Sequence, residues 1–173
     1  MNAILLILLL LQTQTLFDFS KEASLEGWIV VNDGVMGGLS RSTLKLNAGG
    51  HGVFSGKVSL ENNGGFASIR LDCSRVSLKN TQSMVLHVKG DGGRYQFRLR
   101  ARKDDYYAYI HYFKTSGDWE KITLPLSEFY PTFRGRKLNL PDFAGDYLEE
   151  VGILIGNKQE EVFELQIDSI CLE

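Results

Sequence analysis

The chain has 173 residues, 43% of them hydrophobic and 23% charged, a composition typical of one globular domain with a sizeable core. Its formal net charge of −2 excludes nucleic-acid binding that depends on an overall basic surface. Eighteen glycines against three prolines predict many turns and few helices.

The chain begins with a hydrophobic leader, which we place at residues 1–15. Its nine apolar residues, Ala3 to Leu11, suit a signal peptide and are fewer than the roughly 20 of a membrane-spanning helix. No lysine or arginine precedes this stretch, and "QTQT" after it is not a typical cleavage site. We expect an exported, periplasmic or membrane-associated protein that touches membrane only through the leader; a cytoplasmic location and the cleavage of the leader stay open.

A glycine-rich loop follows at residues 32–41, with the sequence "NDGVMGGLSR". It is not a phosphate-binding loop, because it has no lysine, its glycines lack the G-x-G-x-x-G spacing, and a strand-like segment follows it instead of a helix. The loop is expected to be a tight connection after a strand led by Trp28, with the Asp33 side chain capping the turn.

From Leu16 onward the hydrophobic pattern has a period of two, which predicts β-strands in a single domain over residues 16–173. Roughly nine such runs, separated by turn signals such as "ENNGG" and "GDGG", predict an all-β jelly-roll β-sandwich. Near the end, "VGILIG" at residues 151–156 is apolar on both faces, which predicts a central strand.

The clearest alternation is "RYQFRLRAR" at residues 94–102. One face is apolar and the other polar: Tyr95, Phe97, Leu99 and Ala101 against Arg94, Gln96, Arg98, Arg100 and Arg102. The polar face is either a solvated face paired with acids or a surface that binds an anion or a partner. RNA binding is disfavoured, because the aromatic rings point away from the arginines.

Residues 126–150 are predicted to form one long irregular loop, with a helical turn near 127–129 or 146–150. Its aromatic residues favour packing over disorder, and "FRGRK" at residues 133–137 forms a basic tip of the kind that contacts partners.

No catalytic or metal site is predicted. His51, His87 and His111 lie in different predicted strands without histidine or cysteine partners at metal-ligand spacing, so we assign no catalytic residue, no metal and no cofactor. Cys73 and Cys171 either form one disulfide or stay as thiols. The protein is expected not to be an enzyme.

Five ordered segments resemble the complex I intermediate-associated protein 30 family: "GWIVVNDGVMGGLSRS", "FSGKVSLENNGGFASIRL", "VKGDGGRYQFRLR", "W…ITLPLSEFYPTFRGR" and "VGILIGNKQ…F.LQIDSI". The resemblance runs from about Phe17 to Glu173. It implies a galactose-binding-like jelly-roll β-sandwich and a non-catalytic assembly factor, or chaperone, that holds intermediates of respiratory complex I. No arginine- and serine-rich transit peptide precedes the domain, which puts that client in doubt.

Three loops are expected to meet at one end of the sandwich and to bind a partner protein, a subunit of a respiratory or other membrane complex. The proposed partner-binding residues are Asp33, Met36, Asn63, Arg134 and Arg136. The turn-forming residues are Gly34, Gly37, Gly38, Asn62, Gly64, Gly65, Gly90, Asp91 and Gly92. A simpler interpretation is that Asp33, Asn62 and the glycines only shape turns.

The alternative function is a carbohydrate-binding module of the galactose-binding-like class, with a glycan as ligand. It predicts that Tyr107, Tyr109 or Trp119 is exposed in a shallow groove. The oligomeric state, a structural calcium ion and the identity of the partner stay open.

Overall fold

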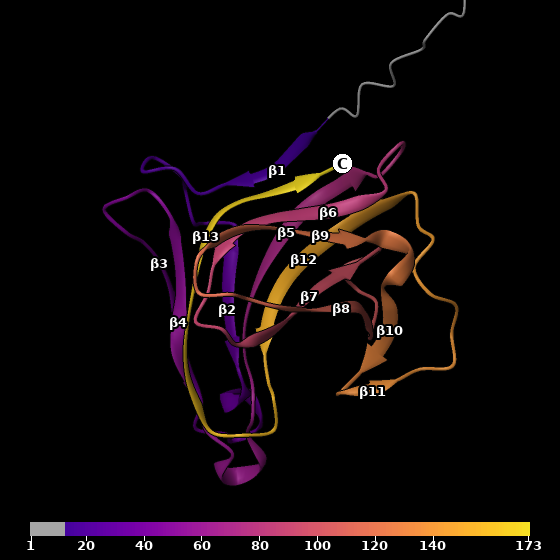
Figure 1. Ribbon diagram of the computed structural model, residues 1–173. Helices are drawn as coiled ribbons and strands as arrows, with labels where there is room; N and C mark the ends of the chain where they lie inside the picture. The colour runs from indigo at the N-terminus through magenta and orange to yellow at the C-terminus, as the bar shows by residue number, and fades with distance from the viewer. Residues whose placement is uncertain (1–12) are drawn as a thin grey trace, which may run out of the picture.

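The computed structural model describes residues 13–173, apart from the side chains of Val35 and Met36, and consists of two antiparallel β-sheets packed as a sandwich (Figure 1). This architecture confirms the all-β sandwich prediction. Most of the predicted leader lies outside the described residues. In the part of the chain that is described, no helix combines the length and the apolar character of a membrane crossing.

The first sheet has six strands. Five lie in the order β3 (Arg41–Leu46), β4 (Gly52–Val58), β13 (Glu161–Leu172), β6 (Ser83–Lys89) and β9 (Trp119–Pro125). The sixth, β1 (Gln14–Asp18), pairs with the last residues of β13, so both ends of the described chain lie at the same end of the sandwich (Figure 1). Gln14 and Thr15, which we assigned to the leader, belong to this strand.

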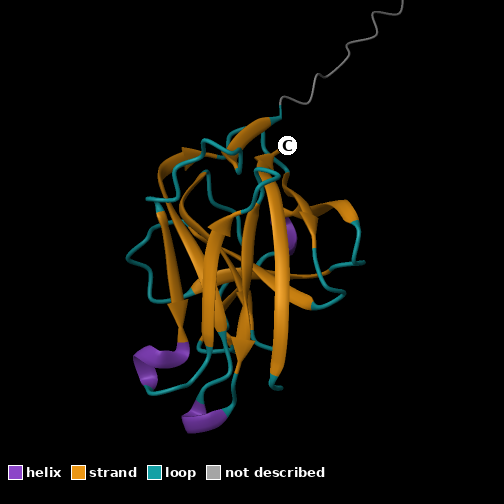
Figure 2. Ribbon diagram, turned by 90° about the vertical axis from the view of Figure 1, so that its left-hand side faces the viewer, coloured by secondary structure: helices purple, strands orange, loops and turns teal. Residues whose placement is uncertain are grey.

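The second sheet has seven strands. Their order is β11 (Arg136–Lys137), β10 (Tyr130–Phe133), β8 (Ala108–Lys114), β7 (Arg94–Arg100), β12 (Tyr147–Ile155), β5 (Ala67–Ser77) and β2 (Trp28–Asn32). Short helical turns form at η1 (Asp33–Met36), η2 (Glu61–Asn63) and η3 (Leu126–Glu128). Figure 2 shows η1 and η2 together at one end of the sandwich, opposite the C-terminus.

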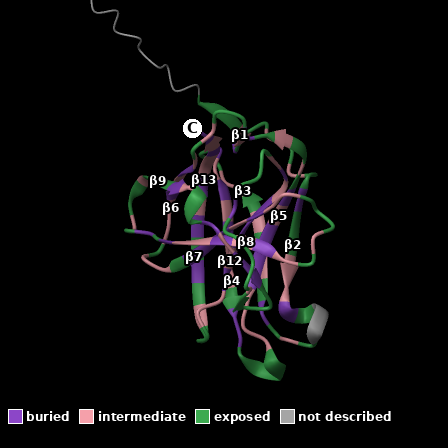
Figure 3. Cartoon of the chain, turned by 90° about the vertical axis from the view of Figure 1, so that its right-hand side faces the viewer, coloured by how far each residue is buried: buried purple, intermediate pink, exposed green. Residues whose placement is uncertain are grey.

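The core lies between the sheets and is formed by the apolar face of each strand. Tyr95, Phe97 and Leu99 of β7 all point into it, as the alternation predicted. Figure 3 shows the buried residues along the central strands and the exposed ones mainly in the loops at both ends. One face of each strand thus packs into the core, and the opposite face points outward and can carry polar groups.

The connection over residues 126–150 is more regular than predicted. It contains η3, close to the expected turn at 127–129, and the β10–β11 hairpin, so that irregular backbone remains only over residues 138–146. The helical turn predicted at 146–150 was wrong, because β12 already begins at Tyr147. The register with β5 shifts between Leu148 and Glu150, with the extra residues on β5, and the buried positions of β12 step from Leu148 to Val151, which interrupts the period-two pattern by which this strand could have been recognised.

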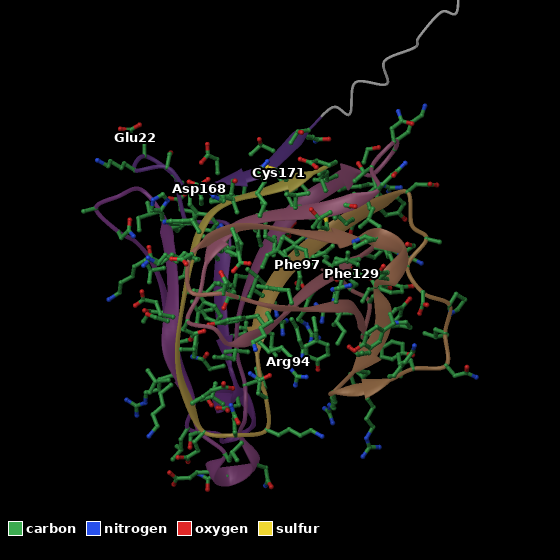
Figure 4. The ribbon with its side chains drawn as sticks, viewed as in Figure 1. Glu22, Arg94, Phe97, Phe129, Asp168 and Cys171 are labelled. Atoms are coloured by element: carbon green, nitrogen blue, oxygen red, sulfur yellow. The ribbon has the colours of Figure 1, made fainter. Side chains whose placement is uncertain are left out.

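Phe129 fastens this connection to the core. Its side chain is fully buried, with its ring 6.2 Å from that of Phe97 (Figure 4). Its backbone carbonyl accepts a hydrogen bond from the Phe143 N–H at 2.8 Å, which ties the irregular segment to the hairpin. The hairpin is thereby attached to the molecule both by the pairing of β10 with β8 and by the buried Phe129 ring.

Replacing Phe129 with alanine should lower the free energy of unfolding by about 3–5 kcal/mol, because the change leaves a cavity in the core. Urea denaturation measures this loss. Val162→Ala, which truncates a side chain that is 80% exposed, is the control and should change stability by less than about 0.5 kcal/mol. Equal stabilities of the two variants would contradict the anchoring role of Phe129.

Candidate functional site

The glycine-rich loop is organised around the buried carboxylate of Asp33, which is 0% exposed. One carboxylate oxygen accepts a hydrogen bond from the Ser40 N–H at 2.9 Å. The other accepts from the Gly65 N–H at 2.6 Å, from the Phe66 N–H at 3.2 Å and from the Ser40 hydroxyl. The carboxylate therefore joins "NDGVMGG" to "NNGGF", two loops that are about thirty residues apart in the sequence.

Two glycines make room for this carboxylate. A Cβ atom on Gly38 would lie 2.3 Å from Asp33 Oδ1, and one on Gly64 would lie 2.7 Å from Asp33 Oδ2. Both distances are far below a van der Waals contact, so a larger residue at either position would displace the carboxylate. These two glycines are needed for close approach to Asp33 and not for binding a phosphate.

Asp33 remains ionised in the folded protein. Burial alone would raise its pKa, but the hydrogen bonds from Ser40, Gly65 and Phe66 outweigh this effect, so the pKa lies below its ordinary value of 3.8. Since the carboxylate is buried and bonded within the chain, a partner protein cannot reach it. The geometry gives Asp33 the turn-shaping role that we had considered as the simpler interpretation.

The other predicted partner-binding residues whose side chains are described are exposed. Asn63 is exposed in η2, and Arg134 and Arg136 are exposed at the tip of the β10–β11 hairpin. The side chain of Met36 is outside the described residues. The remaining predicted turn residues occupy η1, η2 and the β6–β7 connection, where the Asp91 carboxylate accepts hydrogen bonds from the Gly93 N–H and the Tyr95 hydroxyl.

The "NNGGF" and "FRGR" loops border one cavity of about 420 Å³. Gly64, Gly65 and Phe66 line one side, and Phe133, Arg134 and Gly135 line another. The floor is the outer face of the seven-stranded sheet. The structure thus brings the two loops together at one cavity. Arg134 lines one side, and on the other side the Gly65 N–H donates a hydrogen bond to the buried Asp33 carboxylate.

The floor carries the arginines of the "RYQFRLRAR" strand. Arg98 of β7 and Arg70 of β5 are both paired in register with Gly152 on the intervening strand β12. Because glycine has no side chain, nothing on β12 separates the two guanidinium groups at this level. In the adjacent row, Arg100 donates a hydrogen bond to Glu150 at 2.9 Å, forming an ion pair.

The cavity is strongly basic. Five cationic side chains line it, and none of its lining residues is acidic. Burial, followed by the charges of Arg70 and Arg100, lowers the pKa of Arg98 to about 10. Burial also lowers the pKa of Arg70; the charge of Glu150 partly offsets this effect, and the charge of Arg100 adds to it. The cationic residues are Arg70, Arg98, Arg100, Arg134 and Lys158.

The polar face of β7 is therefore sheltered from Gln96 to Arg100 and solvated at Arg94, which is exposed. Gln96 is only 9% exposed, and the Arg100 side chain is 16% exposed. The alternation of apolar and polar residues in this strand was predicted correctly. Arg100 is paired with an acid, Glu150, which is the kind of partner predicted for this face. The cavity itself was not predicted, although a glycine in the middle of the apolar run "VGILIG" was a signal that neighbouring groups approach this strand closely.

A second polar cluster lies on the outer face of the six-stranded sheet. Asp168 of β13 is flanked by His51 at 3.3 Å and His87 at 2.8 Å, and the Trp119 ring packs against both imidazoles (Figure 4 labels Asp168). Burial raises the pKa of Asp168, but the His87 hydrogen bond and the two histidine charges keep it below its ordinary value. In residues 13–173, no set of three or more His, Cys, Asp or Glu side chains is placed to hold a metal ion.

The aromatic residues are divided between the two sheets. Tyr107 and Tyr109 are half-buried, whereas Trp119 is 37% exposed on the six-stranded sheet. Tyr106 is 63% exposed and stands at the cavity, with its ring 5.4 Å from that of Phe133. The sequence analysis did not single out Tyr106 as a candidate contact. Cys73 and Cys171 are both free thiols.

Comparisons with known proteins give one family and one fold. The family model of complex I intermediate-associated protein 30 matches residues 17–167. The mouse protein "Complex I intermediate-associated protein 30, mitochondrial" is 24% identical over 185 residues, which cover 92% of this chain and 56% of the mouse protein. The chain therefore spans little more than half the length of this relative.

Similar solved structures are carbohydrate-binding modules. A family 11 module from Clostridium thermocellum, solved with a β-1,3-1,4-mixed-linked tetrasaccharide, has a TM-score of 0.66 at 14% identity, covering 92% of this chain and 94% of that chain. A family 29 module has a TM-score of 0.58 at 10% identity, covering 93% and 87%. At these identities the likeness shows a shared β-sandwich fold and nothing about the ligand.

Asp33→Asn should lower the free energy of unfolding by about 2–4 kcal/mol, because an amide cannot accept all of the hydrogen bonds that converge on the carboxylate. Urea denaturation at neutral pH measures the loss. Asp18→Asn, at an exposed position, is the control and should change stability by less than about 0.5 kcal/mol.

The same variant should alter the response to acid. The folded pKa of Asp33 lies below its ordinary value of 3.8, so its stabilising contribution is complete above that pH and is lost as pH falls through the folded pKa. Between pH 5 and the acid-unfolding midpoint (about pH 2–4), the original chain should lose stability more steeply than Asp33→Asn. Parallel stability curves would show that Asp33 does not titrate as described.

Proposed function

The chain belongs to the complex I intermediate-associated protein 30 family, and from this premise we propose that it is a non-catalytic domain that binds a partner protein at the end of the sandwich where the arginine-lined cavity opens. The family and the carbohydrate-binding-module fold are both typically non-catalytic. We propose an assembly-factor role, with a subunit or intermediate of a membrane respiratory complex as the partner.

The observation that carries this proposal is the meeting of two loops, distant in sequence, around one basic cavity. Asp33 holds the "NNGGF" loop by accepting hydrogen bonds from the Gly65 and Phe66 N–H groups, and Phe129 holds the connection that bears the hairpin. Loops that are rigid before binding lose less conformational entropy when a partner docks. This end of the molecule is therefore prepared for binding.

The charge of the hairpin tip indicates which charge a partner surface should carry. Arg134, Arg136 and Lys137 are all exposed there, within four residues. Lys137 lies over the Tyr130 ring, with its ammonium 4.8 Å from the ring centroid, which orders its side chain. Exposed cations on a fixed hairpin favour binding of a partner with an acidic surface and increase the rate of association with it.

Carbohydrate binding is the second candidate, and Tyr106 favours it. This ring is 63% exposed beside the cavity, and exposed aromatic rings stack on the C–H faces of sugars. The tyrosines on which we based this alternative, Tyr107 and Tyr109, are half-buried. A glycan would therefore contact Tyr106 and Phe133 at the cavity, or Trp119 on the other sheet.

The decisive experiment is crosslinking in the native cell, followed by mass spectrometry of the proteins recovered with the tagged full chain. Arg134→Glu/Arg136→Glu should reduce recovery of the respiratory-complex subunits by about tenfold, because it reverses two rim charges. The matched control, Lys45→Glu/Lys57→Glu, makes the same charge change at exposed positions of the six-stranded sheet and should recover the same subunits as the original chain.

Recovery of no respiratory-complex subunit, or equal recovery with both double variants, would contradict the proposal. Binding of glycans that is lost in Tyr106→Ala would instead support the carbohydrate-binding alternative.

A further inference from the structure

The floor of the cavity has more positive than negative charge. Three guanidinium groups, those of Arg70, Arg98 and Arg100, face a single carboxylate, Glu150, and that carboxylate is paired with Arg100. Within the described residues, Arg98 donates to a neutral acceptor, Gln96 Oε1 at 2.9 Å, and has no carboxylate partner within ion-pair distance. Burying a cation without a counter-charge costs free energy, so the folded chain keeps an unmet need for an anion here.

The two unpaired arginines are placed to share one anion. Adjacent strands lie about 4.8 Å apart, so Arg70 on β5 and Arg98 on β7 start about 10 Å apart, with β12 between them. Both are in register with Gly152, and both side chains line the cavity. An oxyanion in the cavity between them would therefore be within reach of both guanidinium groups, whose planar donor forks match a carboxylate.

The opening of the cavity identifies the class of occupant. Tyr106 and Phe133 form an aromatic edge, and Arg134 and Lys158 add two cations near it. An extended peptide crossing this edge would pack apolar atoms against the rings and place a side chain into the cavity at every second residue. Further acidic residues in that peptide would be attracted by the cations at the edge.

We propose that the cavity is the anchoring pocket for an acidic segment of the partner protein, with one aspartate or glutamate carboxylate bound between Arg70 and Arg98. This inference rests on the proposed function, because it takes the occupant from the partner that docks on the loops around the cavity. It adds the chemical group that the partner must present, which is a carboxylate. It also gives the cations two roles: the exposed Arg134 and Arg136 attract the acidic partner, and the more buried Arg70 and Arg98 bind its carboxylate.

The first test is binding of a fluorescent peptide of alternating glutamate and glycine to the full chain, measured by anisotropy. The peptide should bind, and the matched glutamine peptide should bind about tenfold more weakly or less. Arg98→Met should reduce affinity for the glutamate peptide by about tenfold or more, because it removes the charge while keeping the apolar stem. Arg94→Met is the control, since Arg94 is on the same strand but stacks on Tyr112 outside the cavity and should change affinity less than about twofold.

The stability of the unliganded variant tests the premise. Arg98→Met should be at least as stable to urea as the original chain, because it removes a buried charge without a carboxylate partner. A strongly destabilised variant would show that Arg98 is a structural residue and would overturn the proposal. Arg70→Met changes the less buried of the two arginines, and it is a second binding variant that should show the same loss of affinity.

Two results with other probes would also overturn it. Peptide binding absent up to about 1 mM, or equal for glutamate and glutamine peptides, would show that the cavity does not recognise carboxylates on a peptide. Glucuronate or inorganic phosphate binding in an Arg98-dependent manner, without binding of the glutamate peptide, would assign the cavity to a small anion.

Crosslinking in the native cell separates this inference from the function on which it rests. If Arg134→Glu/Arg136→Glu loses the partner and Arg98→Met retains it, the partner docks on the exposed rim and the anchoring pocket is wrong. If both variants retain the partner, both proposals fail. Loss of the partner in both, with Arg94→Met unaffected, supports both.

Discussion

The buried carboxylate of Asp33 is the interaction on which this end of the molecule depends. It gathers backbone donors from two loops that begin where the pairing of β2 with β5 ends, at Asn32 and Ala67, and Gly38 and Gly64 leave the space that it occupies. An ionised group in such a position is stable because hydrogen bonds replace its lost hydration. The wall of the cavity formed by Gly64 to Phe66 is therefore held from inside the protein, and its outer surface is free to contact other molecules.

The charged side chains on the outer faces of the two sheets differ in whether they have partners of opposite charge. On the six-stranded sheet, Asp168 is matched by His51 and His87, and Trp119 covers both rings. On the seven-stranded sheet, Arg70 and Arg98 have no carboxylate partner in the described chain, and the β10–β11 hairpin stands over them. The Asp168 carboxylate already has two histidines beside it, whereas the guanidinium groups of Arg70 and Arg98 have no carboxylate within ion-pair distance in the described residues, so an added anion gains more at the second sheet. This difference is why we place recognition on the second sheet.

The fold alone would not have led to this conclusion. Carbohydrate-binding modules of similar architecture show that a β-sandwich can present a binding surface, but at 9–15% identity their ligands carry no information about this chain. The argument for protein binding comes from family membership and from the residues of the cavity, in which cations outnumber acids. The argument for carbohydrate binding comes from Tyr106 and Phe133 at the same cavity, so the two candidates share a location and differ in chemistry.

Sequence patterns by themselves determined the strands, the core and the family. Alternation of apolar and polar residues identifies the buried face of a strand, as with Tyr95, Phe97 and Leu99, because neighbouring side chains in a strand point to opposite sides. The pattern fails where the period changes, as between Leu148 and Val151 of β12. It identified the loops that surround the cavity but not the cavity itself.

Only the tertiary structure decided what lies on the other side of each strand. A polar face reads the same in sequence whether it meets water or a covering hairpin, so the burial of Arg98 and the pairing of Arg100 with Glu150 could not be foreseen. The contact of Asp33 with Gly65 and the common register of Arg70, Gly152 and Arg98 join residues far apart in the chain. Such contacts depend on which strands become neighbours, and local patterns of residue type do not record that choice.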